Sequence, residues 1–383
     1  MKITLSVIKA DIGSIGGHIC PSQHLLQTVE RHVLQSRYDM AFIRDSYVSY
    51  TGDDIAILMT HTRGPGAEPI HKLAWDAFVA GTVEAKEQGL YGAGQDLLKD
   101  AFAGNVRGMG PAVAEMEFDE RAGEPFLFFA ADKTDPGAYN LPLYLAFADP
   151  MNTPGLILAP SMAEGFKFVI MDVAYTDGDR IIELNTPEDI YDIAALLRDA
   201  ERYVVESIWS RATGEQAVAA CTTRLHNIAG TYTGKDDPVM LVRVQKSFPA
   251  TGEVLAPYAV APYVAGGMRG SHNMPLMPVA LNSTISYFDG PPVVSCAAFA
   301  MQNGKLTEPT DAFKHPFWDR VRNRVADKSL EMRRQGFFGA AMLPISELEY
   351  TGIKEKLEEL DKRFRIRSQE SRPLRVSAGG ATS

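Results

Sequence analysis

Aspartates flank the apolar, strand-like segments of this chain. Each aspartate or aspartate pair stands next to one such segment: Asp11 after 3–9, Asp132 after 126–131, Asp53-Asp54 before 55–60, and Asp236-Asp237 before 239–245. The end of one strand lies beside the start of an antiparallel neighbour. We therefore expect the four groups to meet along one edge of a mixed sheet.

Such a meeting would crowd about six carboxylates into one cleft, together with His18 and Gln95. Carboxylates this close repel one another unless divalent cations lie between them. Hard oxygen ligands favour Mg²⁺, which commonly also holds substrate phosphates. Sites with several metal ions transfer phosphoryl groups to water, and an unliganded carboxylate can take the proton of that water. The pattern predicts a Mg²⁺-dependent enzyme of the phosphatase type.

The segment Tyr232-Thr-Gly-Lys235-Asp236-Asp237-Pro238 adds an amine to this acidic set. It places a phenol three residues before a lysine and two carboxylates directly after it. A lysine in such a setting is either a charge partner or a nucleophile that forms an imine. A lone Lys-Asp-Asp-Pro sequence is more often a solvated turn, and only the other acidic groups argue against that interpretation here.

The composition limits the classes of protein to which the chain can belong. Its 383 residues are 45% hydrophobic and 22% charged, which is typical of a soluble globular protein. A net charge of −10 argues against a nucleic-acid or anionic-membrane surface. No run of 18 apolar residues occurs, so we expect no membrane-spanning helix. Three widely spaced cysteines show neither zinc spacing nor a disulfide framework, which fits the reducing cytoplasm.

Strands and helices alternate along the chain in α/β fashion. The pattern predicts further strands at 166–173, 181–184, 203–209, 217–223 and 293–301. It predicts helices at 24–36, 68–88, 187–202, 316–335 and 353–365, with Thr186 as the cap of the third and Gly89 as the stop of the second. Residues 136–165 are expected to form a long loop, and residues 366–383 a disordered tail.

Common nucleotide-binding and hydrolase motifs do not fit. Gly230-x3-Gly234-Lys235-Asp236 has three residues between its glycines where a phosphate-binding P-loop has four, and Asp where Ser or Thr is required. The segment beginning at Tyr91 lacks the third glycine of a dinucleotide-binding fingerprint and follows a helix. A nucleophile elbow for a Ser–His–Asp triad is also absent from the sequence.

One set of motifs, taken in order, resembles a known family. The motifs are Val7-Ile-Lys-Ala-Asp11-Ile-Gly, Gly52-Asp-Asp54, Met59-Thr-His-Thr-Arg63-Gly, Tyr91-Gly-Ala-Gly-Gln95-Asp-Leu-Leu, Phe102-Ala-Gly-Asn105-Val-Arg-Gly, Ala131-Asp-Lys133-Thr, Pro136-Gly-Ala-Tyr139-Asn-Leu-Pro-Leu-Tyr144, Gly234-Lys-Asp-Asp-Pro238-Val-Met, Met268-Arg-Gly-Ser-His272, Phe288-Asp-Gly-Pro-Pro292 and Glu349-Tyr350-Thr. Together they resemble the bifunctional fructose-1,6-bisphosphate aldolase/phosphatases of archaea and deep-branching bacteria, over about residues 1–365.

The resemblance implies an α/β fold, a single-domain four-layer α-β-β-α sandwich with mixed sheets. It implies two successive reactions at one site: condensation of dihydroxyacetone phosphate with glyceraldehyde 3-phosphate, then hydrolysis of the C1 phosphate to give fructose 6-phosphate. Lys235 matches the Schiff-base lysine, Tyr232 the proton donor and acceptor of the aldol step, and Asp11 the proton acceptor of hydrolysis.

The resemblance also implies ligands for several Mg²⁺ ions per site. The matching metal ligands are Asp11, His18, Asp53, Asp54, Gln95, Asp132, Asp236 and Asp237. The matching substrate contacts are His18, Tyr91, Gly104, Asn105, Lys133, Gln245, Arg269, Asp289 and Tyr350.

Family members are commonly large homo-oligomers, often octamers, and this is implied by the resemblance alone. The lysine and two aspartates share one short loop, so imine formation and metal ligation would compete. We hypothesise that the loop rearranges between the two reactions, with Tyr350 moving as its counterpart. Two alternatives stay open: a Mg²⁺-dependent sugar bisphosphatase without significant aldolase activity, and a non-catalytic sugar-phosphate sensor.

Overall fold

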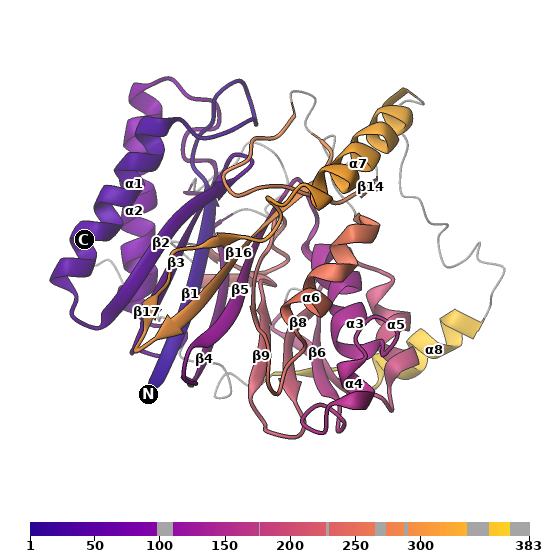
Figure 1. The fold of residues 1–383 in the computed structure, drawn as a ribbon. Helices are drawn as coiled ribbons and strands as arrows, with labels where there is room; N and C mark the ends of the chain where they lie inside the picture. Colours follow the sequence, from indigo (N-terminus) through magenta and orange to yellow (C-terminus); the bar gives the residue numbers. More distant parts are fainter. Residues whose placement is uncertain are drawn as a thin grey trace.

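A computed structural model describes most of the chain (Figure 1). The described residues are 1–97, 110–175, 177–226, 230–264, 273–286, 290–334 and 352–367, and at 223–226 and 230–233 only the backbone is described. Among these residues, no helix combines the length with the apolar character needed to cross a bilayer.

Two large sheets form the middle of the molecule. Within the described residues, the first sheet has the order β11-β10-β4-β1-β3-β2, and its neighbouring strands are antiparallel. Its strands are β1 (Lys2–Asp11), β2 (Ile43–Thr51), β3 (Asp54–His61), β4 (Ala112–Asp119), β10 (Thr223–His226) and β11 (Gly230–Thr233).

The second sheet is larger and has the order β15-β16-β5-β12-β9-β8-β6-β7-β19. The pairing of β15 with β16 is parallel, so this sheet is mixed. Its strands are β5 (Glu124–Asp132), β6 (Phe166–Asp172), β7 (Arg180–Asn185), β8 (Tyr203–Ser210), β9 (Gln216–Ala220), β12 (Val239–Arg243), β15 (Met277–Pro278), β16 (Val293–Gln302) and β19 (Arg365–Ile366). Short strands β17 (Lys305–Leu306) and β18 (Thr310–Asp311) pair with β16, and β13 (Tyr263–Val264) pairs with β14 (Met274–Pro275).

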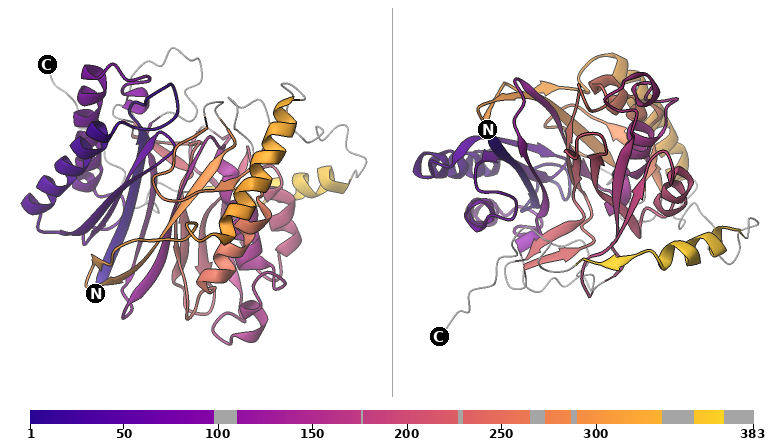
Figure 2. Two further views of the ribbon diagram at one scale, coloured as in Figure 1. Left: turned by 45° about the horizontal axis from the view of Figure 1, so that its top comes forward. Right: turned by 90° about the horizontal axis from the view of Figure 1, so that it is seen from below.

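Helices cover the outer face of each sheet, as the end-on view in Figure 2 shows. The first sheet carries α1 (Gln23–Asp39) and α2 (Glu68–Glu87). The helices on the side of the second sheet are α3 (Asn140–Ala148), α4 (Gly155–Leu158), α5 (Ile190–Leu197), α6 (Thr251–Leu255), α7 (Phe317–Arg334) and α8 (Gly352–Asp361). Three 3₁₀ turns, η1 (Gln95–Leu97), η2 (Pro136–Tyr139) and η3 (Ala256–Val260), complete the described elements.

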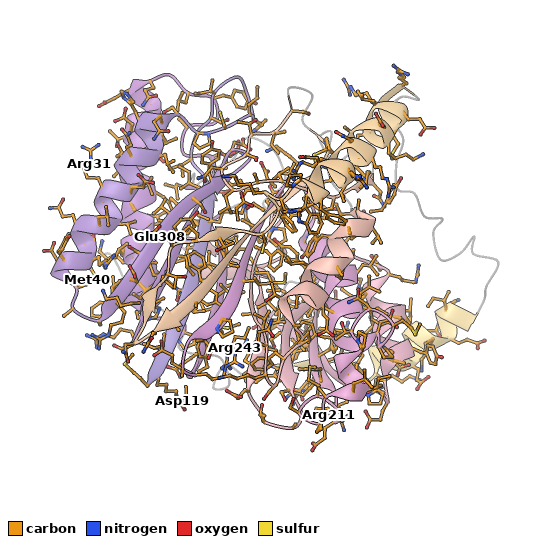
Figure 3. All side chains as sticks on the ribbon, viewed as in Figure 1. Arg31, Met40, Asp119, Arg211, Arg243 and Glu308 are labelled. Carbon is orange, nitrogen blue, oxygen red and sulfur yellow. The ribbon has the colours of Figure 1, made fainter. Side chains whose placement is uncertain are left out.

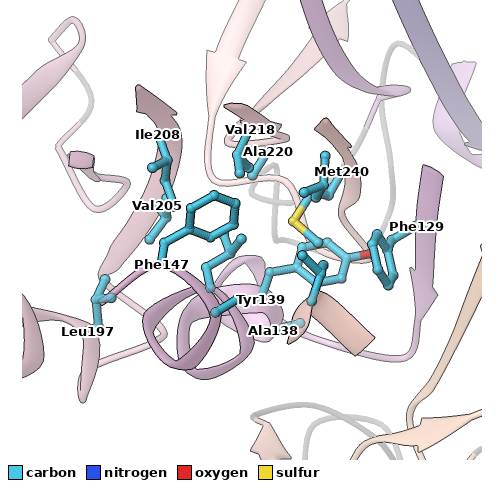
Figure 4. Packing of buried hydrophobic residues seen from close by; sticks show 14 of the residues in the cluster. Phe129, Ala138, Tyr139, Phe147, Leu197, Val205, Ile208, Val218, Ala220 and Met240 are labelled. Carbon is cyan, nitrogen blue, oxygen red and sulfur yellow. The ribbon is translucent and has the colours of Figure 1, made fainter. Parts of the chain in front are cut away.

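Three apolar layers separate these four layers of secondary structure. Strand alternation sends Ile3, Leu5 and Val7 of β1 into a core between the two sheets, where they meet Phe128 and Leu241 of the second sheet. The opposite faces of β1 and β3 pack against α1 and α2. A third core lies between the second sheet and its helices, and Figure 4 shows its aromatic centre around Phe129, Tyr139 and Phe147. The expected four-layer α-β-β-α arrangement with a mixed sheet is confirmed.

Several predicted elements need correction. Residues 136–165 form η2, α3 and α4 rather than a loop. Helix α3 was not predicted because it is apolar on nearly all sides and therefore lacks an amphipathic period. Its Pro142 is compatible with a helix, because it lies in the first turn, where the backbone N–H groups have no partner within the helix. The predicted strand 217–223 is two strands, β9 and β10, because the chain passes from the second sheet to the first between them.

Helix α5 is shorter than predicted and has a different start. It begins at Ile190 and ends at Leu197. Thr186 does not cap it, because the Thr186 hydroxyl bonds the backbone of Phe166 at the start of β6. Helix α8 also ends early, at Asp361, and is followed by β19. Ile366 and Arg367 therefore belong to the fold and not to the predicted tail, and residues 368–383 lie outside the described part of the chain.

Candidate active site

The strand register brings the sequence-predicted aspartates to the same end of the two sheets. Asp11, the last residue of β1, pairs directly with Asp54, the first residue of β3. In the second sheet, Asp132 ends β5, and Asp237 lies just before the antiparallel strand β12. The prediction of convergence is confirmed, but the prediction of a single sheet edge is wrong, because each sheet supplies part of the cluster.

Asp53 and Asp132 join the two sheets at this end. The main-chain N–H of Asp53 donates to Asp132 Oδ2 at 3.2 Å. Lys133 Nζ bridges the same two side chains, at 2.5 Å from Asp53 Oδ1 and 3.0 Å from Asp132 Oδ1. Lys133 and Asp237 both have positive φ, +64° and +49°, a strained backbone conformation that gathers at functional sites.

His18 closes the cluster from the glycine-rich loop after β1. Its Nδ1 lies 2.9 Å from Asp53 Oδ2 and 3.9 Å from Asp11 Oδ2. Its ring meets the ring of Tyr91 edge to face, with centroids 4.9 Å apart. Reciprocal backbone bonds between Ser14 and Tyr91 hold the two loops together. The structure thus brings the predicted residues Asp11, His18, Asp53 and Tyr91 into contact.

The donor set fits a hard divalent cation. Two groups, Asp11–His18–Asp53 and Asp53–Asp54–Asp132, each offer three ligand atoms within 4.8 Å of one another. Burial, followed by the negative charges of Asp53 and Asp54, raises the pKa of Asp11 well above its usual range. Burial likewise raises the pKa of Asp132. The carboxylates therefore cannot all ionise at low cost until a cation enters.

The pKa of Asp53 shifts in the opposite direction, downward. Its burial favours the neutral form, but the hydrogen bond from His18 and the charge of Lys133 outweigh that effect and lower the pKa of Asp53 well below its usual range. Asp53 contributes to both candidate metal groups, so its carboxylate is the fixed negative charge that they share.

Lys235 lies buried beside the acidic cluster, in the link between β11 of the first sheet and β12 of the second. Its Nζ is 3.3 Å from Asp96 Oδ2 and 3.4 Å from Asp236 Oδ1. Burial alone would lower the pKa of Lys235, but the charges of Asp96 and Asp236 raise it far above its usual range. The Asp237 carboxylate in the same loop accepts a hydrogen bond from the Thr134 N–H at 2.7 Å.

Asp96 is a site residue that sequence reasoning missed. It accepts hydrogen bonds from the main-chain N–H of Asp11 at 2.9 Å and of Gly110 at 3.2 Å, in addition to its contact with Lys235. Burial, partly offset by Lys235, raises the pKa of Asp96 to about 6. Its position next to Gln95 of η1 was the available signal, since Gln95 was a predicted ligand. Lys9, which pairs with Asp54, was missed as well.

Some predicted residues are not brought together here. Gln245 lies just past the C-terminal end of β12, whereas Asp237 lies just before the N-terminal end of that strand. The main-chain carbonyl of Gln245 accepts a hydrogen bond from Arg121. Arg243, the last residue of β12, is labelled at that lower end of the sheets in Figure 3. The backbone of Tyr232 lies in β11, two residues before Gly234, and its side chain lies outside the described residues. So do Gly104, Asn105, Arg269, Asp289 and Tyr350.

Comparison with known proteins agrees with this geometry. The sequence profile of a family described as fructose-1,6-bisphosphatase matches residues 2–365. The chain belongs to this family. Among proteins similar to it, a fructose-1,6-bisphosphate aldolase/phosphatase of Thermus thermophilus is 58% identical over 95% of this chain and 100% of the relative. Proteins of the same name from Cenarchaeum symbiosum and Moorella thermoacetica are 52% and 47% identical, covering 95% of this chain and 95% and 94% of their own lengths.

Membership of the fructose-1,6-bisphosphatase family fits the acidic end of the sheets, where two groups of side chains could hold a metal ion. It does not by itself account for the buried lysine, Lys235, in the same cluster.

Proposed function

We propose that the chain is a bifunctional fructose-1,6-bisphosphate aldolase/phosphatase that works in the gluconeogenic direction. One observation carries the proposal: a buried lysine amine lies in the same cluster as carboxylates arranged for divalent cations. A plain phosphatase has no need of Lys235. The names of relatives with up to 58% identity over nearly the whole chain support the same function.

In the aldol half, Lys235 Nζ attacks the C2 carbonyl of dihydroxyacetone phosphate and water leaves as the iminium forms. The amine must first lose a proton, and Asp96 and Asp236 are the carboxylates within 3.5 Å of it. The iminium acidifies the adjacent C3–H, and Tyr232 is our proposed shuttle for that proton. The resulting enamine carbon adds to the aldehyde of glyceraldehyde 3-phosphate, and the aldehyde oxygen takes up the proton that Tyr232 returns. Water then hydrolyses the iminium and releases the product from Lys235.

In the hydrolytic half, water attacks the C1 phosphorus, the bond to the sugar oxygen breaks, and that oxygen takes up a proton. Bound Mg²⁺ would neutralise the phosphate oxygens and acidify the attacking water. We propose that Asp11, His18, Asp53, Asp54, Gln95, Asp132, Asp236 and Asp237 hold the metal ions. We propose that Asp11 then accepts the proton of the water.

Lys133 and Tyr91 are our proposed contacts to the substrate phosphates and hydroxyls. Lys133 Nζ already lies between two carboxylates at the sheet junction, and Tyr91 is exposed at the mouth of the cluster. Lys235 pairs with Asp96 while Asp237 is tied to Thr134, so the loop that carries both must rearrange if each is to serve its reaction. Identical loop conformations in the imine complex and in the metal-loaded phosphatase complex would contradict this rearrangement.

The test is borohydride trapping with dihydroxyacetone phosphate, followed by mass mapping, on the wild type and on Lys235→Ala. We expect a reduced adduct on Lys235 that is absent from the variant, together with Mg²⁺-dependent phosphate release from fructose 1,6-bisphosphate by both proteins. Lys72→Ala, at an exposed ion pair on α2, is the matched control and should trap as the wild type does.

Two outcomes would favour the other candidate functions. Phosphate release with Mg²⁺ but no adduct in the wild type would leave a sugar bisphosphatase without aldolase activity. Binding of fructose 1,6-bisphosphate with neither adduct nor phosphate release would leave a sensor. The alignment of carboxylates at the sheet ends argues against the sensor, because binding alone does not require a site shaped for several metal ions.

We also propose that the enzyme is a cytoplasmic homo-oligomer. Large apolar side chains are exposed on the helical side of the second sheet: Met151, Ile157, Leu158, Tyr191 and Val260. Contact with further copies of the chain would bury them, and sedimentation equilibrium would measure the assembly.

The cytoplasmic location that we propose fits the cysteines. Cys20, Cys221 and Cys296 are free thiols, which suits a reducing compartment.

A further inference from the structure

Lys9 is a buried lysine that neither half of the proposed chemistry uses. It lies on β1, on the face that carries Leu5 and Val7 into the core between the two sheets. Its exposed fraction is 1%, and it is among the largest fully buried side chains of the described residues. A lysine this deeply enclosed is rare unless a negative charge compensates it.

The compensating charges are those of the candidate metal site. Lys9 Nζ forms an ion pair with Asp54 Oδ2, in which both side chains are almost fully buried. The Asp54 carboxylate supplies the negative charge that a buried ammonium at Lys9 requires.

Lys9 differs from the other two lysines of the cluster in its access to ligands. Lys133 is our proposed substrate contact, and Lys235 is our proposed nucleophile. Both lysines must therefore leave their present carboxylate partners when substrate binds. Lys9 is buried between the two sheets, where its Nζ pairs with Asp54. Its charge stays at the inner end of the cluster whatever binds at the outer end.

We infer that Lys9 is a permanent counter-cation of the metal site and a positioning residue for the Asp54 carboxylate. Its ammonium neutralises part of the negative charge of the site, so that bound divalent cations need to neutralise less. The inference rests on the proposed metal dependence and goes beyond it, because it assigns one positive charge of the site to the protein itself.

The test is thermal unfolding of Lys9→Met, which removes the ammonium and keeps most of the volume, in EDTA and in saturating Mg²⁺. In EDTA we expect its Tm to lie more than about 5 °C below that of the wild type, because Asp54 keeps a buried charge without a partner. In Mg²⁺ that deficit should shrink by about half or more, since the metal then supplies the missing charge. Equal deficits in both conditions would mean that Lys9 only fills space, and would overturn the inference.

A second variant keeps the test decisive if Lys9→Met is poorly folded. Lys9→Met combined with Asp54→Asn removes both partners of the buried pair and should recover stability in EDTA relative to Lys9→Met alone. A double variant no more stable than the single one would contradict the inference. Lys72→Met, at the exposed pair with Asp76, is the control and should change Tm by about 1 °C or less in either condition.

These readouts also separate this inference from the proposed function. A wild-type protein whose Tm does not respond to Mg²⁺ would contradict the proposed metal dependence and the role of Lys9 together. A wild-type response with an equal response in Lys9→Met would contradict only the role of Lys9. Since no readout measures turnover, loss of either catalytic activity would leave the result for Lys9 unaffected.

Discussion

The main-chain N–H of Asp53 donates a hydrogen bond to Asp132 Oδ2 across the boundary between the two sheets. Asp53 precedes β3 of the first sheet, and Asp132 ends β5 of the second. The same two carboxylates are bridged by Lys133. The distance between the sheets at the acidic end is therefore fixed by the residues that we propose as metal ligands, and a change in the packing there should alter metal binding.

Gly52→Ala tests this close approach. Gly52 has φ +61°, and a Cβ atom there would overlap Asp132 Oδ2 and lie 2.8 Å from Ile285 Cγ1. We expect a loss of about 3 kcal/mol in the free energy of unfolding, part from the left-handed backbone and part from displacement of Asp132. Urea unfolding measures the loss, and titration with Mg²⁺ should show weaker binding.

Gly123→Ala is the matched control for that substitution. Gly123 has the same φ of +61°, but among the described residues beyond its two chain neighbours no heavy atom lies within 4 Å of the position that its Cβ would take. We expect a loss of only about 1 kcal/mol from the strained backbone, with unchanged Mg²⁺ affinity. Equal effects of the two substitutions would show that the sheets tolerate separation at Asp132.

Binding of Mg²⁺ should release protons. Burial, followed by the charges of Asp236 and Asp54, raises the pKa of Asp237 to about 7. About half of the metal-free molecules are then protonated at Asp237 at pH 7, and the proton must leave before the carboxylate can hold a cation. We expect more protons released at pH 6.5 than at pH 8.5, as measured by calorimetry in buffers of different ionisation enthalpy.

Asp237→Asn should reduce that proton release at pH 6.5 and weaken Mg²⁺ binding. Asp149→Asn, on the turn after α3 and away from the cluster, should change neither quantity. A proton count in the wild type that does not depend on pH between 6.5 and 8.5 would contradict the assignment of Asp237 as a ligand that titrates near neutrality.

Stability in acid should depend on a different pair at the opposite end of the second sheet. The Glu124 carboxylate accepts hydrogen bonds from Arg243 Nε at 3.0 Å and from Arg243 Nη2 at 3.1 Å, and both side chains are fully buried. Burial favours the neutral acid, but hydrogen bonds from Arg121 and Arg243 outweigh it and lower the pKa of Glu124 below 4.5. Its contribution is then fully present above pH 4.5 and is lost as the pH falls through the lowered pKa.

Glu124→Gln should therefore cost ~3 kcal/mol in the free energy of unfolding at pH 7, because it leaves buried arginines with too little negative charge. The difference from the wild type should shrink as the pH is taken below 4.5. Glu188→Gln, at an exposed pair with Arg211, should leave the unfolding curve close to that of the wild type. A difference for Glu124→Gln that stays constant down to pH 3 would contradict the role given to its charge.

Much of the site could be predicted because short-range patterns fix it. The alternation in β1 and the apolar segment of β5 identify strands, and an antiparallel register then places Asp11 opposite Asp54. The resemblance to a known family supplied the rest of the ligand set. The helix over 140–148 was missed because burial on most of its surface erases the amphipathic period on which such predictions depend.

Contacts between distant segments could not be predicted in the same way. Asp96 acts on Lys235 from 139 residues away, and Lys9 acts on Asp54 from the neighbouring strand. Neither residue type is unusual in sequence. Asp96 and Lys9 matter because they are buried. Burial makes an unpaired charge costly, so each charge stays paired with its partner in the site.

The sequence by itself determined that aspartates flank the strands β1, β3, β5 and β12, because hydrophobic period and turn residues act over a few positions. Only the tertiary structure decided that two sheets, not one, build the acidic cluster. The chain crosses from β9 to β10 and returns from β11 to β12, and that exchange places Lys235 beside Asp96. Sheet assignment depends on which apolar faces pack together across the whole molecule, and no local pattern encodes that choice.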